Sequence, residues 1–279
     1  MLDTTTKSLE ELGFASNMRK SFSPRKRHVV DMIATICWFH ALRIHLDAST
    51  VVAVQRAIEP VEIGDPDGVY RRWREYHKGR HSPRRRVIDM CNEVCPQAVA
   101  VYRSPLWCAL RLDRPIDQVA KSLLGTTCRL GDELIKRMWN FPENSRPHVD
   151  PRWMRKRGMA MLRQGNLEGL AVLVVCMRLA ASQGLSRLAV TFYRYAAHCM
   201  KTLGIWFYAL GVAQGLSEYL EDDLLPICGD AAFLGNFSSV HYLSQIQSMG
   251  IELKRVVAAN NNRLTAIEEV EVVIGWLDL

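Results

Sequence analysis

VYRRWREYHKGRHSPRRRVIDMCNEVC, residues 69–95, combines the charge, the aromatic spacing and the helix end signals around which the rest of the chain can be interpreted. Before Asp89 it holds eight basic residues against one acidic residue, Glu75, which gives a net charge of +7. The whole chain has 36 Lys and Arg and 29 Asp and Glu residues, so its formal net charge is also +7. The excess charge is therefore concentrated in one segment. Its basic residues are Arg71, Arg72, Arg74, Lys78, Arg80, Arg84, Arg85 and Arg86.

The first half of this stretch predicts an amphipathic helix from Val69 to His77. Tyr70, Trp73 and His77 recur three to four residues apart, so one face can pack inward while the basic face points outward. Gly79 follows where a left-handed C-cap is expected. The segment therefore predicts a basic helix with a defined C-terminal end.

Similar signals predict the neighbouring helices. Ser82 and Pro83 form an N-cap and N1 pair, which predicts a helix from there to Val94. Ser49 is the expected N-cap of a preceding helix that ends before Pro60. The remaining helices are expected at His28–Leu46, Ser49–Glu59, Gln97–Tyr102, from Ser104–Pro105 onward, Pro115–Leu124, Gly131–Trp139, Arg152–Gln183, Leu185–Leu203, Gly204–Glu221, Ser239–Asn260 and Leu264–Leu279.

These signals predict an all-α protein with a short-helix N-terminal half, containing a basic helix-turn-helix-like unit, and a C-terminal helical bundle. Residues 141–151 hold three prolines and no apolar periodicity, which indicates a linker. The expected division is a polar basic arm at 1–27, a helical basic domain at 28–140, the linker at 141–151 and the bundle at 152–279. Only Val270–Leu277 could instead form a strand.

Composition limits the classes of protein. An apolar content of 48% is normal for a globular core, and 23% charged residues argues against wholesale disorder. Eight scattered cysteines favour reduced, buried thiols, and the N-terminus lacks a signal-peptide core, so we expect a cytoplasmic protein. The apolar segment Leu203–Ser217 is too short to span a membrane and is better read as a core helix.

No motif in the sequence indicates catalysis. The nucleotide-binding, zinc-protease and hydrolase signatures are absent, so we expect no enzyme activity and no cofactor. Cys91 and Cys95, with His77 and His81 nearby, could be drawn as a metal site, but their spacing is not that of a zinc knuckle and two buried helical thiols are the simpler reading. The acidic cluster Glu218, Glu221, Asp222 and Asp223 similarly reads as an exposed helix end.

The order of elements favours nucleic-acid binding. A helix with several arginines can enter the major groove, where arginine reads guanine while neighbouring cations hold phosphates. The expected helix start at Ser82 would add amide donors near a phosphate. The expected contacts are Arg71, Arg72, Arg74 and Lys78, supported by Arg80, Arg84, Arg85 and Arg86. A solvated, charged helix face is the plain alternative.

This arrangement resembles the lambda-repressor and Cro-like helix-turn-helix family over about residues 28–96. The resemblance rests on Ala53 and Ile58 in the first helix, Trp73 in the second, and then Gly79 and Ser82-Pro83 before the next helix. The segment Glu59–Gly68 is longer than the turn of that family. The resemblance implies duplex DNA binding through Arg71, Arg72, Arg74 and Lys78.

The sequence thus predicts a DNA-binding protein that acts in transcription regulation or in a nucleoprotein complex, with no membrane partner. Its C-terminal bundle could form a homodimer or dock a protein partner, through the apolar face around Trp206, Phe207 and Tyr208. A non-enzymatic helical adaptor and a helical effector enzyme with an unrecognised site remain open.

Overall fold

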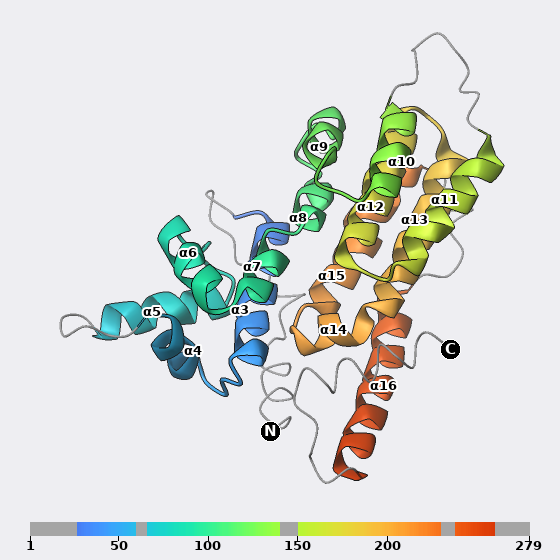
Figure 1. Ribbon diagram of the computed structural model, residues 1–279. Helices are drawn as coiled ribbons and strands as arrows, with labels where there is room; N and C mark the ends of the chain where they lie inside the picture. The colour runs from blue at the N-terminus through green and yellow to red at the C-terminus, as the bar shows by residue number, and fades with distance from the viewer. Residues whose placement is uncertain (1–26, 60–65, 140–149, 230–237, 260–279) are drawn as a thin grey trace. The chain divides into compact units, whose positions relative to one another are not determined.

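The computed structural model describes residues 27–59, 66–139, 150–229 and 238–259, and Figure 1 shows that these residues are helical with short connections. No strand occurs among them, so the all-α class is confirmed. Val270–Leu277 and the helix expected at Leu264–Leu279 lie outside the described residues.

The described residues form two compact units. The first contains residues 27–59, 66–103, 204–216 and 243–259, and the second contains 104–139, 150–203, 217–229 and 238–242. In the second unit, helices from both sides of the expected 141–151 linker pack on one common helix. The predicted division into an arm, two domains and a linker stays a prediction, and residues 141–149 lie outside the described part.

In the first unit, α3 packs against α5 and α7, and α4 packs against α5 and α6. Trp38 of α3 packs against Trp73 and Tyr76 of α5, with ring centroids 6.1 and 5.7 Å away. All three side chains are at most 1% exposed, so they form the centre of this unit. The helices are α3 (Val29–His45), α4 (Val51–Ile58), α5 (Pro66–His77), α6 (Arg85–Val94), α7 (Pro96–Tyr102) and α14 (Gly204–Ala209).

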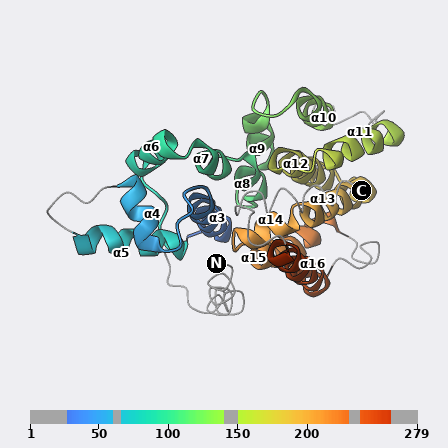
Figure 2. The same ribbon diagram turned by 60° about the horizontal axis from the view of Figure 1, so that its bottom comes forward.

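In the second unit, α12 is the central helix. Its residues 169–180 are all buried, and α8, α9, α10, α11 and α13 pack around it. Figures 1 and 2 both show α12 lying against α10 and α13. The helices are α8 (Pro105–Leu110), α9 (Ile116–Leu123), α10 (Arg129–Trp139), α11 (Pro151–Arg163), α12 (Leu167–Ser182) and α13 (Ser186–Thr202).

Two helices contribute residues to both units. They are α15 (Ala213–Tyr219), which continues into the one-turn helices η1 (Leu220–Leu224) and η2 (Leu225–Cys228), and α16 (Ser239–Ala259). None of the helices in the described part of the chain is long and apolar enough to cross a membrane.

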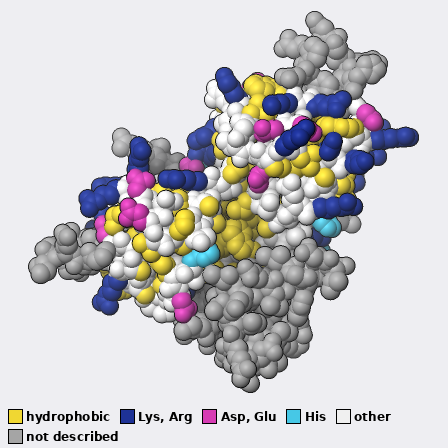
Figure 3. Space-filling model, viewed as in Figure 1, with side chains coloured by type: hydrophobic (Ala, Val, Ile, Leu, Met, Phe, Trp, Pro, Cys, Tyr) yellow, Lys and Arg dark blue, Asp and Glu magenta, His cyan; other side chains and the backbone are white. Residues whose placement is uncertain are grey.

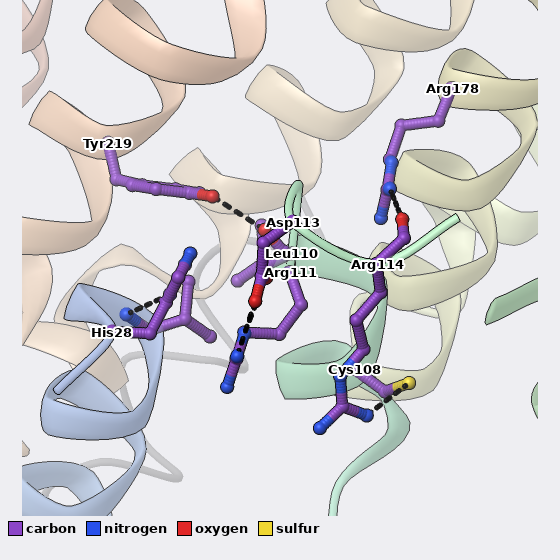
Figure 4. A network of polar contacts seen from close by, with 9 residues as sticks. His28, Cys108, Leu110, Arg111, Asp113, Arg114, Arg178 and Tyr219 are labelled. Carbon is purple, nitrogen blue, oxygen red and sulfur yellow. Dashed lines mark hydrogen bonds and ion pairs between the residues drawn. The ribbon is translucent and has the colours of Figure 1, made fainter. Parts of the chain in front are cut away.

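Two buried side chains hold the C-terminal end of α8. The guanidinium of Arg178 donates to the carbonyl oxygens of Ala109 and Arg114 at 2.7 and 2.8 Å. The hydroxyl of Tyr219 donates to the carbonyl oxygen of Leu110 at 2.6 Å (Figure 4). The last carbonyls of a helix have no partner within that helix, so these donors fix α8 against α12 and α15.

Several predicted helix ends are confirmed. Ser104 accepts a hydrogen bond from the amide of Leu106 and caps α8, with Pro105 as its first residue. Gly79 and Gly184 adopt φ values of 65° and 71°, the left-handed conformation expected at helix ends.

Two long helices predicted in the C-terminal half are wrong. The segment Arg152–Gln183 forms α11 and α12, because Gly165 turns the chain at φ 57° and Asn166 caps α12 by accepting from the amide of Gly169. The segment Gly204–Glu221 forms α14 and α15, with Gly211 at φ 69° between them. The break at Gly165 lets α11 and α12 pack against each other, which one continuous helix could not do.

Candidate nucleic-acid interface

The solvent face of α5 carries basic side chains opposite its buried aromatic residues. Trp73 and Tyr76 point into the first unit, at 0% and 1% exposure. Arg71 and Arg74 are exposed, and Lys78, the residue after the helix, is half-buried. Positions three and four residues apart share one face of a helix, so these three cations lie along one line. The Arg74 guanidinium lies 5.6 Å from the centre of the Tyr70 ring.

Arg72, which the sequence grouped with those cations, is held on the inner side of α5. One of its terminal nitrogens donates to both carboxylate oxygens of Glu59, at 2.7 and 2.8 Å. The indole Nε1 of Trp73 donates to the same carboxylate at 3.1 Å. Glu59 thus neutralises Arg72, so this arginine is less suited than its neighbours to contact a polyanion.

The basic residues beyond α5 stand among acidic ones. Arg80 lies 3.6 Å from Glu75, and Arg85 lies 3.8 Å from Asp89. Arg84 and Arg86 are exposed, but positions 89 and 93, both acidic, share the face of α6 on which residue 86 stands. Figure 3 shows basic and acidic side chains mingled over the region of α5 and α6. Arg80 and Arg85 are therefore each partly offset by a neighbouring carboxylate.

The predicted start of α6 at Ser82 and Pro83 is wrong. The helix begins at Arg85, its N-cap is Arg84, and no side chain caps it. The expected phosphate-binding amides at Ser82 are therefore not those of a helix end. A similar shift occurs in α4, where the hydroxyl of Thr50, rather than that of Ser49, accepts from the amide of Ala53.

Arg27 belongs to the basic arm expected from the sequence, but in the structure its side chain makes hydrogen bonds within the first unit. Its guanidinium donates to the carbonyl oxygens of Gly79 and Asp31 and to the Thr35 hydroxyl. Gly79 touches α3 so closely that a Cβ there would lie 2.9 Å from the Met32 carbonyl oxygen. These contacts fix the end of α5 on α3. Nothing in the sequence around position 27 distinguishes it from the two preceding basic residues.

Cys91, Cys95 and His40 are buried near α5, whereas His77 is half-buried and His81 is exposed. Burial raises the pKa of the Cys91 thiol to about 12 and also raises the pKa of Cys95. His40 is 2% exposed, and its Nε2 has no hydrogen-bond partner among the described residues. Burial, and then the neighbouring Arg43 and His77, lower the pKa of His40 to about 3.

Within the described ranges, no group of three or more His, Cys, Asp or Glu side chains is placed to hold a metal ion. The acidic cluster at the end of α15 has a structural contact, because the Glu221 carboxylate accepts from the amide of Ser239 at 2.8 Å. Of the apolar face at 206–208, Phe207 is fully buried and Trp206 packs on it with ring centroids 5.3 Å apart. Trp206 and Phe207 thus contact each other within one chain. Dimerisation through this face stays a prediction.

No family model, curated protein or solved structure matches this chain. The helix-turn-helix resemblance therefore rests on the residues alone. Of the residues that carry it in the two helices, Ile58 is 4% exposed and Trp73 is fully buried, whereas Ala53 is half-buried. The link between α4 and α5 includes residues 60–65, which lie outside the described part.

Proposed function

We propose that this protein binds duplex DNA without catalysing a reaction, through the solvent face of α5, as a regulatory or nucleoprotein-complex protein. The observation that carries the proposal is the line of Arg71, Arg74 and Lys78 on the face opposite Trp73 and Tyr76. Cations in such a line can neutralise successive phosphates, and the release of counterions supplies affinity.

The dimensions of α5 support entry into the major groove. Its 12 residues give an axis of about 18 Å, and a groove about 12 Å wide admits one helix. Within this arrangement Arg71 and Arg74 are proposed to contact phosphates on the walls of the groove, because their side chains lie in line with Lys78 on the solvent face. Lys78, Arg80, Arg84, Arg85 and Arg86 lie further along the chain and are proposed to contact phosphates.

The experiment that tests the proposal compares two neighbouring arginines and a triple variant. Arg71→Ala, Arg74→Ala and Lys78→Ala together should weaken duplex binding and reduce the slope of log affinity against log salt by roughly 2.7, about 0.9 for each lost phosphate contact. Arg72→Ala removes the same charge as Arg71→Ala but should leave the slope unchanged, because Glu59 already neutralises Arg72.

Fluorescence anisotropy of a labelled duplex, measured over a salt series, gives both quantities. Circular dichroism and thermal melting of each variant establish that it is folded. If the folded triple variant keeps the affinity and the salt slope of the natural protein, α5 is not the binding face. Negligible duplex binding by the natural protein even at low salt would favour the adaptor function instead.

A further inference from the structure

The second unit carries a basic surface that is not apparent from the net charge of the whole chain. Helices α11 and α13 contain no Asp or Glu, although each contains several Lys and Arg residues. Their exposed basic side chains are Arg152, Arg155, Lys156 and Arg163 on α11, and Arg187, Arg194, His198 and Lys201 on α13. Counted over the whole chain, this charge is offset by acidic residues in other elements.

On each helix these side chains share one face. Residues 152, 155, 156 and 163 fall within about 100° of one another at 100° per residue, and residues 187, 194, 198 and 201 fall within about 60°. The opposite faces contain Met154 and Met161 on α11 and Ala196 and Met200 on α13, all fully buried. Each basic face therefore points to solvent, away from the side that packs on α12.

Two close contacts show that α11 and α13 lie parallel and in register. A Cβ at Gly158 would lie 2.8 Å from ring carbons of Tyr195, and one at Gly165 would lie 3.2 Å from the Thr202 side chain. Both pairs are separated by the same 37 residues along the chain. The two helices therefore run in the same direction, side by side, with their basic faces on the same side of the unit.

This register sets the dimensions of the basic surface. Along α11 the cations from Arg152 to Arg163 span about 16 Å, and along α13 those from Arg187 to Lys201 span about 21 Å. Packed helices lie about 8–10 Å apart, so the surface consists of two parallel columns of cations. Figure 3 shows Lys and Arg side chains over the region of α11, with some Asp and Glu side chains towards α10.

We propose that the paired basic faces of α11 and α13 bind the phosphate backbone of duplex nucleic acid. A duplex carries one charge per about 1.7 Å of its axis, so a surface about 20 Å long faces many phosphates on two strands. Two helices packed side by side are too broad for a major groove about 12 Å wide, so their cations meet the phosphate backbone rather than base edges. The surface therefore binds duplex independently of sequence.

Other polyanions fit this surface less well. Single-stranded nucleic acid is usually held by exposed aromatic rings, whereas Trp153 and Tyr195 are half-buried and Phe192 and Tyr193 are buried. The guanidinium groups of Arg137 and Arg157 lie 4.3 and 5.4 Å from the centre of the Trp153 ring. A helix that binds a lipid surface inserts its apolar face, and here the apolar faces are packed on α12.

This surface lies in the second unit and uses none of the residues of α5, so it can be tested separately from the proposed function. The variant Arg155→Ala, Arg163→Ala, Lys201→Ala removes three exposed cations from it. The control Lys121→Ala, Arg129→Ala, Lys136→Ala removes the same charge from exposed positions of the same unit. Both are compared in the full-length chain by anisotropy with a labelled duplex over a salt series.

We expect the first variant to weaken duplex binding and to lower the salt slope by roughly 2.7, and the control to leave the slope unchanged. Equal losses in both variants would show a general effect of net charge and would overturn the proposal. Variants with the α5 substitutions Arg71→Ala, Arg74→Ala and Lys78→Ala separate the two surfaces, because duplex binding that remains should still depend on the second surface.

If the α5 substitutions alone remove all duplex binding from a folded protein, this second surface is overturned while the proposed function stands. If they have no effect and the α11–α13 variant loses binding, α5 fails and the second surface stands. The last experiment measures binding of the natural protein and the α11–α13 variant to phosphatidylcholine vesicles with and without phosphatidylserine. Loss of binding to the phosphatidylserine vesicles in the α11–α13 variant, with duplex binding unchanged, would overturn the proposal in favour of a lipid surface.

Discussion

One terminal nitrogen of Arg72 donates to both carboxylate oxygens of Glu59, at 2.7 and 2.8 Å. The side chains of this pair are 30% and 23% exposed, and Trp73 donates to the same carboxylate. A charge pair with a shared indole donor at the end of α4 joins that helix to α5. Arg72 therefore contributes to the packing of the helices, whereas Arg71 beside it faces solvent.

Glu59→Ala should destabilise the first unit. The substitution leaves the half-buried guanidinium of Arg72 and the indole of Trp73 without their acceptor, and we expect the free energy of unfolding to fall by about 2 kcal/mol. Glu59→Gln keeps an acceptor and should cost about 1 kcal/mol. Urea unfolding measures both. Glu75→Ala is the control, since its partner Arg80 is 61% exposed and such pairs contribute little. Equal losses from Glu59→Ala and Glu75→Ala would contradict this role.

Gly79→Ala should cost more stability than Gly125→Ala. Both glycines have positive φ values, 65° and 78°, so alanine is strained at either position. A Cβ at Gly79 would also lie 2.9 Å from the Met32 carbonyl oxygen, whereas one at Gly125 meets nothing within 4 Å. We expect losses of about 2–3 kcal/mol and about 1 kcal/mol, measured by urea unfolding. Similar losses at the two sites would show that the α5–α6 turn can move away from α3.

Arg178→Met should destabilise the second unit strongly. Arg178 is 6% exposed and donates to two carbonyl oxygens at the end of α8 and beyond it. Methionine fills a similar volume but leaves both carbonyls without these donors, so we expect a loss of about 2–4 kcal/mol. Tyr219→Phe removes one donor and should cost about 1 kcal/mol. Thermal or urea unfolding gives the two values, and a larger loss for Tyr219→Phe would reverse the assigned roles.

His40 should make the protein sensitive to acid. Because burial lowers its pKa from 6.5 to about 3, the unfolded chain takes up a proton below pH 6.5 that the folded chain does not. The free energy of unfolding should therefore fall as the pH drops from 6.5 toward 3, by up to about 1.4 kcal/mol per pH unit. Above pH 6.5 this contribution to the pH dependence vanishes.

Urea midpoints at pH 7.5 and at pH 5 test this dependence when the natural protein is compared with His40→Leu. The difference between the two pH values should be smaller in the variant, because it lacks the titrating group. An NMR signal of the His40 ring that titrates near pH 6.5 in the folded protein would disprove the assignment.

Much of the helical pattern is encoded locally. The short signals at Ser104-Pro105, Gly79 and Gly184 predict helix ends that the structure confirms, because caps and left-handed glycines act over a few residues. The signal at Ser82-Pro83 fails, although it is equally strong in the sequence. Pro83 is buried there while Ser82 and Arg84 are exposed, and the helix begins only at Arg85.

The candidate nucleic-acid interface was likewise predictable from the sequence only in part. The sequence by itself determined that the basic residues gather at 71–86 and that Arg71, Arg74 and Lys78 share a helix face, because the helical period relates positions three and four apart. Only the tertiary structure decided that Arg72 pairs with Glu59 and that Arg27 holds Gly79. Those partners lie 13 and 52 residues away, and no local pattern records them.

The sequence also determined that the segments of α11 and α13 are basic and that each can place its cations on one face. It could not show that the two faces adjoin, because a charge balance taken along the chain ignores position in space. The tertiary structure decided this, since the small Gly158 and Gly165 let α11 lie close against Tyr195 and Thr202 of α13. Packing on α12 then buries the apolar faces and turns both basic faces to the same side, because burial removes apolar surface from water while charged groups remain solvated.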